Sequence, residues 1–146
     1  MNFFKTLSLK SKAQFDVSDI TKQVQQAVQE SGISNGLVNV QTMHTTATVF
    51  VNENEPLLLK DFKNHLQKIA SSDDTYNHDN FEERTVNMCE DECVNGHSHC
   101  KALHLPVSVC LNIKEKKIQL GTWQRIMFIE LDRVRQRNIQ IQVIGE

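Results

Sequence analysis

The chain has 146 residues and a formal net charge of −2, and 39% of its residues are hydrophobic and 23% charged. This length suits a single domain, residues 1–146, that buries a core without disulfides. Because basic residues are not in surplus, neither nucleic acid nor an anionic membrane is expected as a partner. No apolar run is long enough for a membrane span or a signal peptide, and four cysteines are too few for a disulfide scaffold. We therefore expect a cytoplasmic protein.

Most of the chain alternates apolar and polar residues, a pattern that predicts strands. Strands are predicted over residues 3–17 (two short strands), 36–44, 46–53, 105–113, 117–132 and 138–145. Between the two halves lies an acidic and polar stretch without clear periodicity, residues 71–95. A stretch of this length is typical either of a functional loop or of disorder.

Two segments have helical periodicity. In residues 18–32, Ser18 or Asp19 is the expected N-cap, and Gly32 ends the helix. The second helix is predicted over residues 55–70, with proline near its start and apolar residues on one face. Two helices packed on mainly antiparallel strands define an α+β fold.

Three polar motifs are candidates for chemistry, and each also has a plain structural interpretation. His44 follows a strand, where side chains meet at a pocket rim, or is a partly exposed histidine among strand-favouring threonines. Glu53 lies at a strand-to-helix junction and is either a general base or metal ligand, or part of a helix cap. The carboxylate of Asp79 would fix the tautomer of His78 and raise its basicity, unless both belong to a solvated loop.

The segment MCEDECVNGHSHC, residues 88–100, contains three of the four cysteines and two of the six histidines. Three residues lie between Cys89 and Cys93, whereas two residues usually lie between paired cysteine ligands of structural zinc sites. A single residue separates His97 from His99, where three to five are usual. The spacing favours cysteines that act as small buried hydrophobes over a closed local zinc site.

The run LGTWQRIMFIELDRVRQR, residues 120–137, combines an aromatic residue, an amide and several charges. Trp123 offers an aromatic wall and Gln124 an amide. The forked guanidinium groups of Arg135 and Arg137 suit a phosphate. Alternatively, these arginines form ion pairs between strands or subunits.

Three segments in this order, MHTTATVFVNENEPLLLKDF, NGHSHCKAL and LGTWQRIMFIELDRVRQRNIQIQVIG, resemble the YjbQ family, described as secondary thiamine-phosphate synthases. The resemblance extends from about Phe4 to Gly145. It implies a compact α+β fold with a β-sandwich-like core, assembled as a homotrimer with pockets near the subunit contacts. It also implies an activity that joins a pyrimidine-methyl diphosphate to a thiazole phosphate and releases pyrophosphate.

The motif matches and the local chemistry together give a set of site residues. Those expected to bind a divalent metal, zinc or magnesium, are His44, His78 and His99. Those expected to be catalytic are Glu53, His78, Asp79 and Gln124. Those expected to bind a phosphorylated small molecule are Thr45, Thr46, Asn52, Asn95, Trp123, Arg135 and Arg137.

The chain departs from the family pattern in ways that affect function. It has DRVRQR where the family usually has GPR, and its cysteines match no family motif. It has no glycine-rich phosphate loop, which fits a weak or side synthase activity. The sequence leaves open a metal-assisted enzyme and a regulatory protein that holds an anionic small molecule in a trimer pocket.

Overall fold

Two antiparallel sheets form the framework of the protein in the computed structural model, which describes residues 1–146. The larger sheet has five strands in the order β1 (Asn2–Lys10), β8 (Gln136–Gly145), β3 (Gly36–Thr42), β5 (Ser108–Lys114) and β6 (Lys117–Ile118). The smaller sheet has three strands in the order β2 (Val17–Asp19), β7 (Gln124–Glu130) and β4 (Ala47–Glu53). The predicted α+β class with a sandwich-like, mainly antiparallel core is confirmed.

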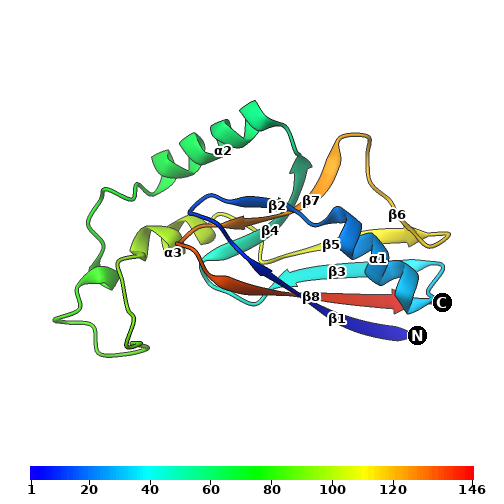
Figure 1. The fold of residues 1–146 in the computed structure, drawn as a ribbon, viewed down its shortest axis with the longest axis horizontal. Coiled ribbons are helices and arrows are strands. Elements are labelled where there is room, and N and C mark those ends of the chain that lie inside the picture. Colours follow the sequence, from blue (N-terminus) through cyan, green and yellow to red (C-terminus); the bar gives the residue numbers. More distant parts are fainter.

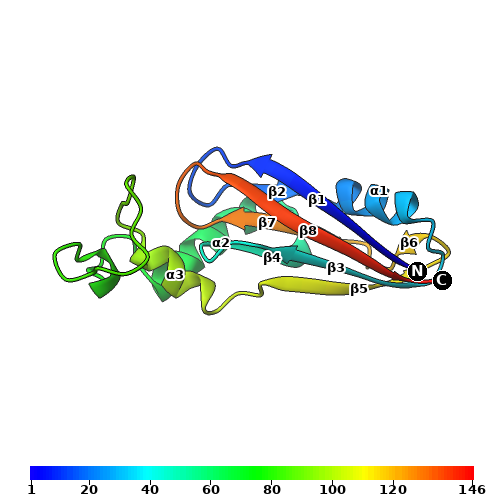
Figure 2. The ribbon, with the colours of Figure 1, turned by 90° about the horizontal axis from the view of Figure 1, so that it is seen from below.

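Three α-helices complete the fold. They are α1 (Thr21–Ser31), α2 (Pro56–Ile69) and α3 (Gly96–Ala102), with a short 3-10 helix, η1 (Asn77–Asp79). In Figure 1 the five-stranded sheet is at the bottom, the smaller sheet and α1 lie above it, and α2 lies on top. Figure 2 shows α3 and the adjoining loop at the end of the molecule opposite to the two termini. No helix is long and apolar enough to cross a membrane.

The main core lies between the inner face of the larger sheet, the smaller sheet and α1. On β8, Ile139, Ile141 and Val143 are fully buried at every second position, as the pleat of a strand requires. From α1, Val24 and Val28 fill the same core at helical spacing. The sequence alternation that predicted the strands is therefore the pattern that builds the core.

The helix ends follow the predicted chemistry with small shifts. Gly32 ends α1 in the left-handed conformation, with φ of 73°. The N-cap of α1 is Ile20, and Asp19 accepts a hydrogen bond from the amide of Thr21, so Ser18 does not cap it. At the start of α2 the carboxylate of Glu55 accepts from two backbone amides, as an acidic N-cap should.

Two regions differ from the sequence-based expectation. The stretch 71–95 follows a defined path that includes η1, and it leads into α3, a third helix that the periodicity did not predict. A helix of seven residues is too short to leave a clear periodic signal. The strand predicted over 117–132 is divided into β6 and β7 by an exposed loop.

Candidate functional site

An open cavity of about 420 Å³ lies between α3 and the chain that links β3 to β4. The link contributes His44 and Thr45, and α3 contributes His99 and Cys100. The rim includes Leu103 and Val107, which are 83% and 58% exposed. Two histidines that are far apart in the sequence therefore face the same space, and large apolar side chains surround its opening.

His44 is held in one tautomer by the backbone of β8. Its Nε2 accepts a hydrogen bond of 2.8 Å from the amide of Asn138, so the ring proton lies on Nδ1. Partial burial lowers the pKa of His44, and the positive charge of Arg137 lowers it further. The imidazole is neutral at neutral pH and presents an N–H donor.

His99 lies against His78 from η1. Their ring centroids are 4.6 Å apart with an angle of 63° between the planes. Burial lowers the pKa of His99, and the neighbouring His78 lowers it further. The structure thus brings His78 and His99 together and places His99 and His44 on one cavity.

Asp79 does not orient His78 as predicted. Its carboxylate accepts hydrogen bonds from the amides of Asn95 and Gly96, each 2.9 Å long, and so fastens η1 to the start of α3. A Cβ atom at Gly96 would lie 2.5 Å from the Cβ of Tyr76, so only glycine permits this close approach. Asp79 therefore supports the histidine pair through the backbone.

Arg137 and Thr46 are also placed differently from the prediction that they bind substrate. Arg137 is 3% exposed, and its Nε donates to Glu130 at 2.7 Å. Another nitrogen of the same guanidinium donates to the hydroxyl of Thr46 at 2.9 Å. This buried ion pair joins β8 to β7, the second interpretation considered for these arginines, and neither side chain reaches the cavity.

Asn52, Glu53, Trp123 and Gln124 lie together at the other end of the smaller sheet, around a shallow depression. Glu53 pairs with Gln124 in the strand register, and the β4 residue nearest the histidine cavity is Ala47. Six residues of extended strand separate the two ends by about 20 Å. Within one chain these four residues are therefore separated from the histidine cavity.

The remaining predicted site residues surround Asp132. Asn95 is 5% exposed, its Nδ2 donates to Asp132, and its Oδ1 has no partner. Arg135 donates to the same carboxylate at 2.9 Å and keeps about a third of its side chain exposed. These contacts make Asn95 and Arg135 part of a polar network around Asp132, and neither residue lines the histidine cavity.

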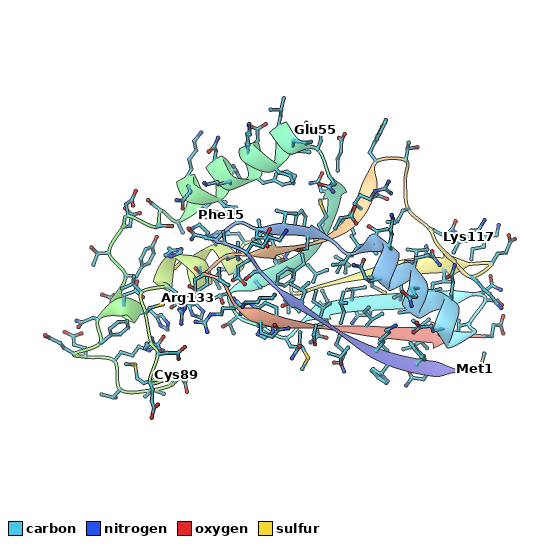
Figure 3. All side chains as sticks on the ribbon, viewed as in Figure 1. Met1, Phe15, Glu55, Cys89, Lys117 and Arg133 are labelled. Atoms are coloured by element: carbon cyan, nitrogen blue, oxygen red, sulfur yellow. The ribbon has the colours of Figure 1, made fainter.

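Metal ligation does not fit a single chain. No group of three or more histidine, cysteine, aspartate or glutamate side chains is placed to hold an ion. The Nε2 atom of His44 is already occupied by a backbone amide, and Asp79 is occupied by α3. The local zinc site considered for residues 88–100 is likewise not formed. All four cysteines are free and none is buried, so the prediction that they act as small buried hydrophobes is wrong. Cys89 lies far out on the projecting loop (Figure 3).

Sequence reasoning missed two residues of this region. Lys101 is completely buried and donates a hydrogen bond to His97. Cys100 lines the histidine cavity. The available signal for Lys101 was its position four residues after His97, which places both on one helical face, but a lysine at that spacing is ordinarily solvated.

The fold and the cavity define a small α+β protein in which two histidines from separate segments, His44 and His99, line an open cavity. The chain belongs to the YjbQ family, as predicted, because the family model described as "UPF0047 protein YjbQ-like" matches residues 5–146.

Related proteins match this chain in sequence along almost its whole length. A UPF0047 protein of Methanothermobacter thermautotrophicus is 33% identical over 99% of this chain and 93% of its own length. The UPF0047 protein YugU of Bacillus subtilis is 30% identical over 97% and 98%. A crystal structure of a Sulfolobus solfataricus protein of unknown function has a TM-score of 0.88 at 30% identity and covers 100% of this chain and 99% of that one. The family is thus one of proteins without an established function.

Proposed function

We propose that this protein binds and acts on a phosphorylated small molecule in the cavity lined by His44 and His99. The observation that carries the proposal is the convergence of these two histidines, both with a lowered pKa, on one open cavity. A neutral imidazole can accept or donate a proton near neutral pH. His99 is the more available of the two for contact with a ligand, because the Nε2 of His44 is occupied by the amide of Asn138.

The anionic nature of the ligand is supported by the charges near the histidines. Arg137 and Arg135 act on His44, and Arg84 acts on His99, in each case disfavouring the protonated imidazole. The same positive potential favours an anion in the cavity. Each of these arginines is itself paired with a carboxylate, and Glu130, Asp132 and Asp79 act on the histidines in the opposite direction. The positive charge is therefore largely offset within the chain, and a phosphate ester would have to bind mainly through hydrogen bonds.

A homotrimer would reunite the two halves of the predicted site. A cyclic trimer needs two different complementary surfaces on each chain. One end of this chain presents Trp123, which is 70% exposed, beside Glu53 and Gln124. The other end presents the apolar rim of the histidine cavity. Head-to-tail contact would place Glu53 and Gln124 of one subunit beside the histidines of the next, where a carboxylate and an amide complete an acid–base site.

The outer face of the larger sheet adds a second surface for self-association. Two rows cross β1, β8, β3 and β5 in the strand register without a charged residue. They are Phe4, Gln142, Asn39 and Cys110, and Thr6, Gln140, Gln41 and Ser108. The fully buried centre of an interface is depleted of charge, so this composition supports contact with another subunit.

The test uses the reaction that the family resemblance implies. The full chain is incubated with the pyrimidine-methyl diphosphate and the thiazole phosphate, and pyrophosphate release is measured for wild type and His99→Ala. We expect weak turnover that falls at least about 100-fold in the variant, because the imidazole N–H of His99 would no longer donate to the diphosphate oxygen that leaves as the C–O bond breaks and the thiazole nitrogen bonds to the methylene carbon. The matched control is His104→Ala, because His104 is an exposed histidine two residues beyond α3. Equal turnover in His99→Ala and wild type would refute the role of His99.

A non-catalytic binding protein is the second candidate, favoured by the separation of Glu53 and Gln124 from the histidines within one chain. In that case the two phosphorylated compounds stabilise the protein against heat without yielding product. A ligand at 100 times its dissociation constant would add about 2.7 kcal/mol to the free energy of unfolding. Zinc or magnesium would need ligands from more than one subunit, and elemental analysis of the purified oligomer tests that hypothesis.

A further inference from the structure

Lys101, on the inner face of α3, is a buried cation without an anionic partner. It is 0% exposed, and no ion pair in the chain includes it. Its Nζ lies 3.0 Å from Nδ1 of His97 and 5.4 Å from the ring centroid of Phe15, which lies between α2 and α3 (Figure 3). A charge in this position is costly unless the groups around it are arranged to accept it.

The neighbours of His97 determine its tautomer. Nδ1 lies within 3.3 Å of three groups: the ammonium of Lys101, the amide nitrogen of Gln14 and the hydroxyl of Ser98. The first two are donors, and the hydroxyl of Ser98 gives its proton to the carbonyl of Leu131 at 2.6 Å. Nδ1 must therefore accept, and the ring proton lies on Nε2.

His97 also lines a second cavity of about 420 Å³, between η1 and the start of α3. His97 is 8% exposed and is the only histidine on this wall, and its Nε2 makes no hydrogen bond within the chain. The lining differs from that of the histidine cavity described above, and no residue is shared between the two. Because Nε2 is not among the fully buried atoms that lack a partner, it keeps access to solvent, and the space that His97 lines is this polar cavity.

The residues that line this second cavity disfavour an anionic ligand. Two carboxylates, Asp74 and Asp79, face the cavity, and no lysine or arginine does. Asn77 and Thr75 add an amide and a hydroxyl that are exposed and have no hydrogen-bond partner within the chain. Tyr76 donates its hydroxyl proton to the carbonyl of Ser71, so its ring serves as a wall. Carboxylates, amides and hydroxyls around one N–H donor match a ligand whose hydroxyl groups both donate and accept.

We infer that this cavity binds a neutral polyhydroxylated small molecule, a sugar or polyol, and that the Nε2–H of His97 donates to one of its oxygens. Lys101 acts as a positioning residue, because its ammonium keeps Nδ1 occupied and so fixes the proton on Nε2. The other ionisable groups that act on His97 are Asp132, Asp79 and His99, and none of them bonds to its ring.

This neutral state of His97 has support from electrostatics. Burial lowers the pKa of His97, and the nearby ammonium of Lys101 lowers it further. The imidazole therefore keeps a single proton at neutral pH and remains a donor of fixed direction. A neutral donor suits a hydroxyl oxygen, because it neither repels nor requires a charge on the ligand.

The experiment records nitrogen-detected NMR spectra of the histidine rings in the full chain, alone and with ribose, glucose or glycerol. We expect a neutral Nε2–H tautomer for His97 and a shift of this signal with at least one of the three probes. Asn77→Ala should weaken that binding about tenfold, the effect of one lost hydrogen bond of about 1.4 kcal/mol. Asn64→Ala, an exposed asparagine on α2, is the matched control and should bind as wild type does.

Other outcomes overturn the inference. They are an Nδ1–H tautomer, no response to any of the three probes, or a His97 shift caused by inorganic phosphate. A response to magnesium ion that disappears in Asp74→Asn would identify a cation site instead, whereas binding of a neutral ligand should persist in that variant. His99→Ala should leave the response unchanged, which separates this cavity from the one proposed for the phosphorylated compound.

Discussion

Replacing Lys101 by methionine should remove a specific dependence of stability on alkaline pH. Burial lowers the pKa of Lys101 from 10.5 to about 8 in the folded chain. Between pH 8 and pH 10.5 the unfolded chain therefore binds more protons at this position than the folded chain does. The free energy of unfolding should rise with pH across this interval, by at most about 3 kcal/mol at 1.36 kcal/mol per pH unit.

Urea denaturation of wild type and Lys101→Met at a series of pH values from 7 to about 11 measures this contribution to the free energy of unfolding. The variant lacks the titrating amine, so it should lack the rise in stability that this amine causes. The difference between the two curves isolates Lys101 from cysteines, tyrosine and other lysines that also titrate there. Lys63→Met is the matched control, since Lys63 lies 5.8 Å from the same Phe15 ring but is exposed to solvent. If the free energies of unfolding of wild type and Lys101→Met change in parallel with pH, the pKa of Lys101 is not lowered by burial and the reasoning is wrong.

Three further predictions concern other parts of the chain. Arg137→Met leaves the fully buried carboxylate of Glu130 unpaired and should lower the free energy of unfolding in urea by about 3–5 kcal/mol; Lys5→Met, which breaks an exposed pair, should have little effect. Lys116→Gly should raise stability by about 1 kcal/mol, because Lys116 has φ of 61° in the turn between β5 and β6, and a loss of stability would contradict this. The His99 ring should titrate below 6.5 by NMR, so that its contribution to stability is lost as pH falls below 6.5; a midpoint above 6.5 would show that the charged form is favoured instead.

The sequence by itself determined the class of fold and most of its elements. Alternation in segments such as 138–145 predicted the strands, because burial on one face of a sheet requires an apolar residue at every second position. The glycine at position 32 ended α1 where expected, since a left-handed residue is needed there. The family followed from short motifs in a fixed order, which the match over residues 5–146 confirms.

The tertiary structure decided which of the motif residues meet. Arg137 was a phosphate ligand or an ion-pair partner by sequence, and its pairing with Glu130 across two strands depends on a register that only the folded sheets define. Asp79 precedes Asn95 by sixteen residues, so its role at the start of α3 arises from the path of an irregular segment. Irregular segments have no periodicity from which their contacts can be inferred.

The two cavities could not be predicted from the sequence for the same reason, because irregular segments form them. The position of His44 beside His99 depends on where a turn and a seven-residue helix come together, and neither is visible in the pattern of apolar residues. Lys101 and His97 share a helical face, but their burial requires Phe15 and Gln14 to pack over them from the other end of the chain. Local sequence therefore fixed the elements, whereas the chemistry of the site was decided by long-range packing that brings distant polar groups into a shared, dehydrated space.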